Sequence, residues 1–599
     1  MTEPVQPFVF AARLADLRRD GKVLVHGRGH PPVLVIHDHD HVYALDNRCP
    51  HMGFPLDRGS VEDGILTCHW HHARFDVASG CTFDLWADDV PRCPVEVRGD
   101  AVWVQPLVGY PDPLAHFRRR LDDGMSHNLA LVIAKSVHGQ LAAGAPPHAI
   151  VRQAALFGAR NRDGWGVGLT ILTALGNVLA GLPERDTCLA LFHGVRRTAD
   201  DCEGEPPRRE RTPLDGAPSQ ETLQGWLRRW SAVRHREAAE RTLLTAIRAG
   251  ASPAALAAML FAAETDRPYA DSGHSLDFIN KAFECLDQIG WEHASAVLPT
   301  VVRGMVDSRG AEESTAWRQP QDLISLLEGV YPELPSLFAA GCQHDTCWRE
   351  HEALAEQLLG DDPHDVVESL KVAIGDGAAS ADLGKALACA AAVRLARFGT
   401  ANEHGDWETA HHTFTYCNAV HQALRRIGAD PRTGDACPAA VRGVFHGAMA
   451  VYLTRYLNVP PARLPGEQRD ALDDFPAGGE DLRTALLDAF DRKGQVDAVG
   501  RLVARYLMLG HDPNTLLAML AQALLREDAG FHSYQSLEAG IRQFREWEPD
   551  SRPARRILIG VARYLAAHSP TERAALQTAD IAGRLMRGAA VHQGLEPRL

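Results

Sequence analysis

Two short stretches in the first hundred residues each offer one thiol and one imidazole. Cys49 and His51 are separated by one residue, and Cys68 and His71 by two. Sixteen residues, from Met52 to Thr67, lie between the stretches. Two cysteines and two histidines can hold a [2Fe-2S] cluster, with both thiolates on one iron and both imidazoles on the other. The same donor set can also hold a tetrahedral zinc ion.

Residues 8–106 resemble the Rieske ferredoxin family, which includes small electron carriers and the N-terminal domains of Rieske oxygenases. The resemblance rests on the four donors and on the flanking stretches Asn47-Arg48, Pro55 to Gly59, and Arg74 to Asp76 with Gly80. It implies that Cys49, His51, Cys68 and His71 bind a [2Fe-2S] cluster. Zinc modules seldom carry these flanks, so the cluster is favoured over zinc.

Three residues depart from the family pattern. High-potential Rieske proteins have an additional cysteine in each loop, where this chain has Phe54 and Trp70, so no disulfide can join the loops. His72 stands where the family usually has glycine. The resemblance therefore implies a potential near the lower end of the Rieske range, which runs from roughly −150 to +300 mV.

Composition sets limits on partners and compartment. The chain has 599 residues, a net charge of −15 and 45% hydrophobic residues, as expected for a globular protein of several domains. Nucleic-acid binding is disfavoured because phosphate recognition needs clustered Lys and Arg. The sequence shows no apolar run that could span a membrane and no signal peptide. Twelve thinly spread cysteines fit reduced thiols in the cytoplasm.

The elements that must position these donors change character along the chain. Residues 5–105 alternate short β-branched runs with Gly, Asp and Pro, which predicts a small antiparallel barrel or sandwich. The dense His37 to His41 tract lies between two such runs and is interpreted as a hairpin turn. Residues 107–113 are interpreted as a linker. Residues 114–599 are Ala- and Leu-rich with helical periodicity, so the predicted fold is a small all-β Rieske domain (1–106) followed by a large all-α domain.

The predicted helical part contains a degenerate repeat. Four Gly-x-x-Pro segments are expected to end one helix and begin the next, because Gly suits a helix C-terminus and Pro the first turn. They begin at Gly144, Gly250, Gly360 and Gly510. The prediction is a set of helical hairpins, with the charged, Pro-rich stretch 202–216 as a long loop.

Several histidines of the helical part lie in apolar surroundings. Two repeats place a His-Ser pair, beginning at His274 and at His532, near a helix start, and further histidines follow at His411, His412, His421 and His446. Each alone is more often a hydrogen-bonded core residue. Imidazoles from facing helices of a bundle can also hold non-haem iron, so these six form a candidate second iron site. Lys281, two turns after His274, is a weak further candidate if carbamylated.

Other patterns are weaker. The Asp-x-x-His-x-x-x-x-His pattern of common Rieske oxygenases does not occur after residue 110. The helical part is faintly similar to questin-oxidase-like proteins, and the similarity implies iron and the oxidation of an aromatic substrate. Cys342, His344, Cys347 and His351 have zinc-type side chains but irregular spacing, and reduced thiols near a loop are favoured.

The favoured hypothesis is an oxygenase in which the cluster passes electrons to a His-ligated iron that activates O₂ on a small organic substrate. Because no nucleotide-binding fingerprint occurs, a separate NAD(P)H-dependent reductase or ferredoxin must supply the electrons. By analogy with ring-forming Rieske oxygenases, a homo-oligomer is also expected. The alternative is an electron-transfer or redox-sensing protein whose helical domain docks a partner. A hydrolase or lyase under redox control is a third hypothesis, without an identifiable nucleophile.

Overall fold

A computed structural model describes residues 7–26, 31–106, 109–344, 347–428, 438–467 and 472–589. By their internal contacts the residues form two compact units, Met1–Ile150 with Ala574–Leu599 and Val151–Arg573. The predicted domain division around residues 106 and 114 stays a prediction. Within the described ranges, no helix combines the length and apolar character that a membrane span requires.

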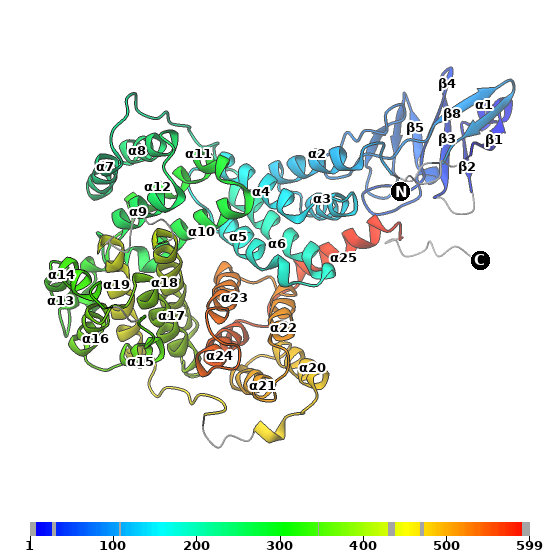
Figure 1. The fold of residues 1–599 in the computed structure, drawn as a ribbon. Coiled ribbons are helices and arrows are strands. Elements are labelled where there is room, and N and C mark those ends of the chain that lie inside the picture. Colours follow the sequence, from blue (N-terminus) through cyan, green and yellow to red (C-terminus); the bar gives the residue numbers. More distant parts are fainter. Residues whose placement is uncertain are drawn as a thin grey trace. The chain divides into compact units, whose positions relative to one another are not determined.

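The first unit begins with short antiparallel strands (Figure 1). They are β1 (Val9–Arg13), β2 (Lys22–Val25), β3 (Val33–Asp38), β4 (His41–Asp46), β5 (Ser60–Glu62), β6 (Ile65–Thr67), β7 (Arg74–Asp76), β8 (Val95–Arg98) and β9 (Ala101–Val104), with helix α1 (Leu14–Asp20) between β1 and β2. The expected turn after β3 is confirmed, since Asp38 pairs with His41 across it.

These strands form three small sheets, in the orders β1-β9-β8, β2-β3-β4 and β5-β6-β7. Alternating residues of β3 point to two different cores. Leu34 and Ile36 join the core that contains Cys49 and Cys68, whereas Val33 and Val35 join a core with strand β9. Cys49 and Cys68 themselves are thus part of an apolar core.

Helices complete the first unit. They are α2 (Pro113–Ser126), α3 (Ala130–Ala142) and α25 (Ala574–Met586), and α3 packs against both α2 and α25. Helix α2 begins at Pro113. Asp112, the residue before it, caps the helix because its carboxylate accepts a hydrogen bond from the Ala115 N–H. Helix α3 buries Lys135 and Gln140 among apolar residues, so polar groups of this helix must find partners inside the unit.

The regular elements of the second unit are all helices among its described residues, which confirms the predicted fold class. Helix α4 (Pro147–Asn161) contains the boundary between the units. It is followed by α5 (Val167–Val178), α6 (Glu184–Cys202), α7 (Gln220–Ala232), α8 (Arg236–Arg248), α9 (Pro253–Glu264), α10 (His274–Ile289), α11 (Ala294–Val297), α12 (Pro299–Asp307), α13 (Leu323–Val330), α14 (Leu334–Gly341), α15 (His351–Gln357), α16 (Pro363–Gly375), α17 (Ser380–Ala396), α18 (His404–Gly428), α19 (Pro438–Thr454), α20 (Gly479–Phe490), α21 (Val496–Met508), α22 (Pro513–Leu525), α23 (Phe531–Phe544) and α24 (Arg552–Ala567).

The Gly-x-x-Pro segments act as predicted. Helices α4, α9, α16 and α22 all begin at the proline of such a segment. Gly144, Gly250 and Gly510 have positive φ angles of 84°, 78° and 74°, which suit the end of the preceding helix. Residues 203–219 form the predicted long loop between α6 and α7. Helix α18 packs against both α10 and α23, and these three helices carry the second cluster of histidines.

Candidate metal centres

The two cysteine-bearing loops have the same backbone pattern. The Cys49 N–H donates to the Phe54 carbonyl at 2.8 Å, and the Cys68 N–H donates to the Ala73 carbonyl at 2.9 Å. In each loop the residue four positions after the cysteine donates back to the cysteine carbonyl and has a positive φ: 79° at Gly53 and 63° at His72. His72 thus occupies a left-handed position that glycine fills without steric cost.

The loops bring the four predicted donors together. The Cys49 and Cys68 thiols are buried and hydrogen-bonded to each other, and the rings of His51 and His71 lie 4.8 Å apart. The Nδ1 atom of His51 is buried without a hydrogen-bond partner among the described residues. A buried, unpartnered ring nitrogen beside a second imidazole and two thiols fits a metal ligand.

Backbone N–H groups support negative charge at the sulfurs. Those of His51 and Met52 face the Cys49 sulfur, and those of Trp70 and His71 face the Cys68 sulfur. The hydrogen bond from the Cys49 thiol lowers the pKa of Cys68 to about 6 against the opposing effect of burial, and it raises that of Cys49. The loops are therefore built to carry thiolates, as a cluster of iron and sulfide requires.

The flanking residues hold the two loops in place. Asn47 and Asp57 exchange two hydrogen bonds of 2.7 Å across the first loop. Glycine is required at two flanking positions, because an added Cβ would lie 2.3 Å from the Thr67 carbonyl oxygen at Gly59 and 2.2 Å from that of Val90 at Gly80. The flanks thus set the loop geometry rather than supply donors.

A second group of potential metal ligands lies in the helical unit. His274 begins α10, His412 lies on α18 and His532 lies near the start of α23, and one ring nitrogen from each lies within 4.8 Å of the others. The Nε2 atoms of His412 and His532 are 3.0 Å apart. Burial first, and neighbouring imidazoles second, lower the pKa of both to about 3. All three rings are therefore neutral at pH 7, the form that binds metal.

One carboxylate supports this three-histidine centre from behind. An oxygen of Glu408 lies 3.3 Å from Nδ1 of His532 and 3.3 Å from Nε2 of His404. An outer carboxylate that accepts the second ring N–H of a ligand fixes its tautomer and orientation. Glu408 was not among the predicted residues, although its position one helical turn before His412 was an available signal.

The other predicted histidines have different surroundings. His411 is fully buried, stacks on Tyr564 at 4.7 Å and lies 5.1 Å from the His532 ring, and both its nitrogens lack partners among the described residues. His421 bonds to Gln543, and His446 receives a 2.8 Å contact from the Tyr331 hydroxyl. The structure brings neither His421 nor His446 into the three-histidine group.

The segment before His274 is conformationally strained. Tyr269, Asp271 and Ser272 have φ angles of 44°, 50° and 54°, and Gly273 follows with 94°. Non-glycine residues in this region cost on the order of 1–3 kcal/mol each and persist only where the surroundings require them. The left-handed turns place the start of α10, and hence His274, against α18.

A buried ladder of polar side chains holds α10 and α23 in register. Gln535 donates to Asp277, and one turn further Lys281 donates to both Glu284, at 2.8 Å, and Glu538. Arg542 closes the ladder on Glu538 at 2.9 Å. Lys281 is therefore a structural cation rather than the metal ligand considered from sequence. A shift of either helix would break several buried charge contacts and separate His274 from His532.

A cavity of about 670 Å³ opens beside the three-histidine centre. His412 contributes to its wall, together with Thr409 and Thr413 from the same helix. The remaining wall mixes apolar or aromatic residues with polar ones. The former are Tyr269, Ala311, Ala316, Trp317, Pro320, Ala450, Leu453, Tyr456 and Leu457, and the latter are Asp271, Ser272, Arg309, Ser314, Gln319 and Thr454. The volume suits a small organic molecule.

The irregular Cys/His group near residue 345 does not assemble among the described residues. Cys342 and Cys347 are exposed, and residues 345–346 lie outside the described ranges. Nε2 of His351 pairs with Asp382 at 2.8 Å, as part of the start of α15. His351 is the first residue of that helix.

Comparison with known proteins identifies the N-terminal module: residues 8–90 match the family model of the Rieske [2Fe-2S] domain. Human apoptosis-inducing factor 3 is 32% identical over 74 residues, 12% of this chain and 12% of that protein. The 4beta-methylsterol monooxygenase of Methylococcus capsulatus is 32% identical over 75 residues, 11% of this chain and 20% of that protein. The vanillate O-demethylase oxygenase subunit of a Pseudomonas species is 37% identical over 71 residues, 11% and 21%. The chain thus spans less than a quarter of each of these relatives.

Solved structures resemble the same module. The ferredoxin of carbazole 1,9a-dioxygenase from Nocardioides aromaticivorans is 31% identical, with a TM-score of 0.16, and the match covers 17% of this chain and 98% of that one. A complex of reduced oxygenase and oxidised ferredoxin in carbazole 1,9a-dioxygenase matches at 21% identity and a TM-score of 0.17, over 17% of this chain and 99% of that one. The match to the family model shows that residues 8–90 form a Rieske [2Fe-2S] domain.

Proposed function

We propose that the protein is a Rieske oxygenase that uses a mononuclear iron in its helical unit. The observation that carries this proposal is the meeting of His274, His412 and His532, one of which, His412, lines a cavity large enough for a substrate. Rieske relatives that include a monooxygenase and an O-demethylase oxygenase subunit support the same reaction class.

In this proposal Cys49, His51, Cys68 and His71 hold the [2Fe-2S] cluster. A cluster held by these residues would supply one-electron transfer. The buried thiols, with N–H groups directed at their sulfurs, stabilise the thiolate ligands. The His71 side is exposed, so an external reductase or ferredoxin can approach that edge.

His274, His412 and His532 hold the second iron, which supplies the capacity to activate O₂. Glu408 orients the His532 ring by accepting its Nδ1–H. A three-histidine set leaves coordination positions free, because three protein ligands do not complete the shell of such a metal. The pattern differs from the usual set of two histidines and one carboxylate, in line with the absence of that motif from the sequence.

The cavity residues position the substrate. Tyr269 and Trp317 stack at 5.7 Å and present flat apolar surface, while the Tyr269 hydroxyl lies 3.4 Å from that of Thr413. The substrate in this proposal is a small organic molecule with apolar surface for Tyr269 and Trp317, and Arg309 and Asp271 of the same wall can contact its polar groups. An aromatic substrate, implied by the faint likeness to questin-oxidase-like proteins, is one such molecule.

Metal analysis of anaerobically purified protein tests the proposal. We expect about three irons per chain, two in the cluster and one in the helical unit. His412→Ala and His532→Ala should each lower this to about two and leave the cluster's spin-resonance spectrum unchanged. Cys68→Ser should remove the cluster and leave about one iron.

The matched control is His446→Gln, which alters a buried histidine outside the three-histidine group. It should leave the iron content unchanged. About two irons in the wild-type protein, or zinc in place of the third iron, would contradict the oxygenase. The first of these outcomes favours the alternative of an electron carrier or redox sensor with a docking helical domain.

A further inference from the structure

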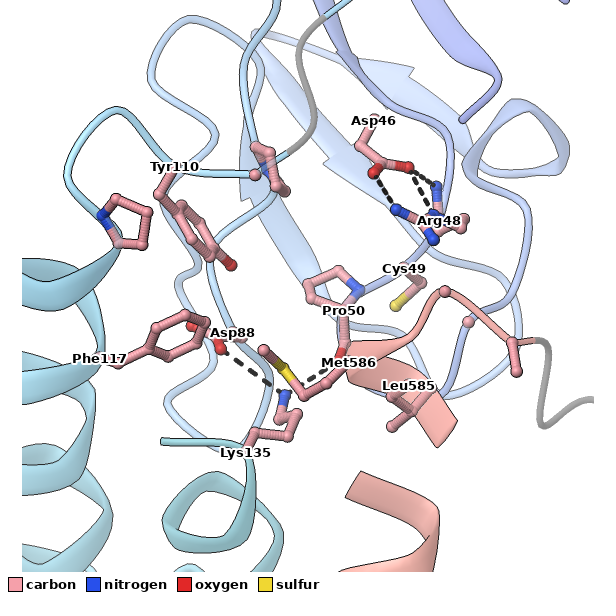
Figure 2. A pocket seen from close by; sticks show the side chains of 16 residues that line it. Asp46, Arg48, Cys49, Pro50, Asp88, Tyr110, Phe117, Lys135, Leu585 and Met586 are labelled. Carbon is pink, nitrogen blue, oxygen red and sulfur yellow. Dashed lines mark hydrogen bonds and ion pairs between the residues drawn. The ribbon is translucent and has the colours of Figure 1, made fainter. Parts of the chain in front are cut away.

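A buried lysine lies directly behind the first cluster loop. Lys135 of α3 has a side chain only 3% exposed, and its Nζ donates a 2.9 Å hydrogen bond to the Pro50 carbonyl. Pro50 is the residue between Cys49 and His51. Figure 2 shows the ammonium group pointing from α3 towards Pro50 and Asp88. The residue comes from beyond residues 8–90, which match the Rieske domain.

Lys135 shares its buried counter-charge, Asp88, with Arg120, which also pairs with the partly exposed Asp123 at 2.9 Å. Asp88 lies 3.8 Å from its Nζ, and the same carboxylate is also 3.1 Å from Arg120 Nε and 3.1 Å from His116 Nε2. Burial by itself would raise the pKa of Asp88, but Lys135, His116 and Arg120 hold it well below its usual value. One buried carboxylate thus faces two buried cations, Lys135 and Arg120, beneath the loop.

The charge of Lys135 acts on both ligands of that loop. Electrostatic interaction with Lys135 contributes, after burial and His71, to lowering the pKa of His51 to about 4. Burial lowers the pKa of Lys135, and negative charge at Asp88 and at the Cys49 sulfur opposes this effect. Pocket residues of α25, including Leu585 and Met586, lie over the same region and add apolar surroundings. Charges interact more strongly where water is excluded.

We propose that Lys135 sets the reduction potential of the cluster held by Cys49, His51, Cys68 and His71, and that Asp88 offsets its effect. Reduction adds one negative charge at the cluster, so a buried cation beside its ligands stabilises the reduced form and raises the potential. The inference rests on the proposed cluster ligation. It also modifies the sequence-based expectation of a low potential, because that expectation considered the loops alone.

The test is a reductive titration of the full-length, cluster-loaded protein, followed by the spin-resonance signal of the reduced cluster. Lys135→Met removes the charge and keeps an unbranched chain of similar length. It should lower the potential, so that the ratio of reduced to oxidised cluster at a fixed potential falls about tenfold, which is 59 mV for one electron. Lys135→Arg keeps the positive charge, so the reduction potential of the cluster should change much less than in Lys135→Met.

Asp88→Asn tests the opposite change, because it removes a negative charge instead of a positive one. It leaves Lys135 without its counter-charge, so the potential should rise. A loss of packing would move both variants in the same direction, whereas a charge effect moves them apart. Arg119→Met serves as the control, because this cation is exposed and pairs with Asp89, and it should leave the potential nearly unchanged.

An unchanged potential in Lys135→Met, with the spin-resonance signal intact, overturns the inference. So does a shift of the same sign in Lys135→Met and Asp88→Asn. If Lys135→Met does not assemble its cluster, an unchanged or lower potential in Asp88→Asn overturns it. Failure of the proposed ligation is recognised separately, because the wild-type protein would then show no reduced-cluster signal.

Discussion

The two candidate metal centres differ in how far apart their ligands lie along the chain. The four cluster donors lie on two neighbouring loops, whereas His412 and His532 of the helical centre are 120 residues apart. Each cluster loop closes on its own backbone hydrogen bonds. The helical centre depends on the packing of α10, α18 and α23. We therefore expect the first to tolerate disturbance elsewhere in the fold better than the second.

Acidification should produce the largest difference in stability between the two regions. Burial lowers the pKa of His193 to about 4, and those of His421 and His446 to about 3, all in the helical unit. In the unfolded chain these groups return to about 6.5. The unfolded state then binds more protons from about pH 6.5 down to about pH 3, so stability is complete above this window and falls within it.

Urea unfolding, measured at several pH values with a probe for each region, checks this response. The helical unit should lose several kcal/mol between about pH 7 and pH 4. In the first unit burial also lowers the pKa of His51, to about 4, and that of His138, so this unit loses stability in the same window through fewer histidines. The contribution of Asp88, whose pKa is lowered, persists through this window and is lost only below the usual carboxyl range. Equal acid sensitivity of the two regions would contradict the comparison.

Breaking the buried ladder should destabilise the helical unit by about 3–5 kcal/mol. Lys281→Met removes the buried cation between Glu284 and Glu538 and leaves only Arg542 to balance both carboxylates. We expect earlier unfolding in denaturant and loss of the third iron, with the cluster spectrum unchanged. Lys371→Met removes a lysine that pairs with Glu333 and Glu368 near the surface and should cost less than about 1 kcal/mol. Equal effects of the two variants would show that the ladder does not hold α10 and α23.

Glu408→Gln tests the comparison at the three-histidine centre. Loss of the outer carboxylate should weaken metal binding at the three-histidine centre by about 10–100-fold. Competition with a chelator followed by metal analysis measures this change. Glu403→Gln, at an exposed position just before α18, is the control. Unchanged affinity in Glu408→Gln would mean that the His532 orientation is fixed by packing alone.

The smallest expected effect is in the second cluster loop. His72→Gly relieves a positive φ of 63° and should stabilise the loop by about 0.5–1 kcal/mol, net of the added freedom of the unfolded chain. Thermal unfolding followed at the cluster absorption would show a slightly higher midpoint. A lower midpoint would indicate that the His72 side chain contributes more than its backbone strain costs.

The fold class and the helix boundaries at the Gly-x-x-Pro segments were predictable because they depend on local backbone preferences. The six predicted histidines show where such reasoning ends. His274 and His532 were selected for their similar helix starts, and His412 for its dense neighbourhood, yet nothing local distinguishes His412 from His421. The two lie on the same helix, and only the approach of α10 and α23 makes His412 one of the three facing rings.

By itself, the sequence determined the Rieske module, because its donors, flanks and turns lie within a single run of residues whose spacing fixes the geometry. Tertiary structure alone decided the rest: which histidines meet, which glutamate supports them, and that Lys135 reaches the Pro50 carbonyl from 85 residues away. The physical reason is that packing and buried charge pairs between distant helices, rather than any local preference, bring those groups together.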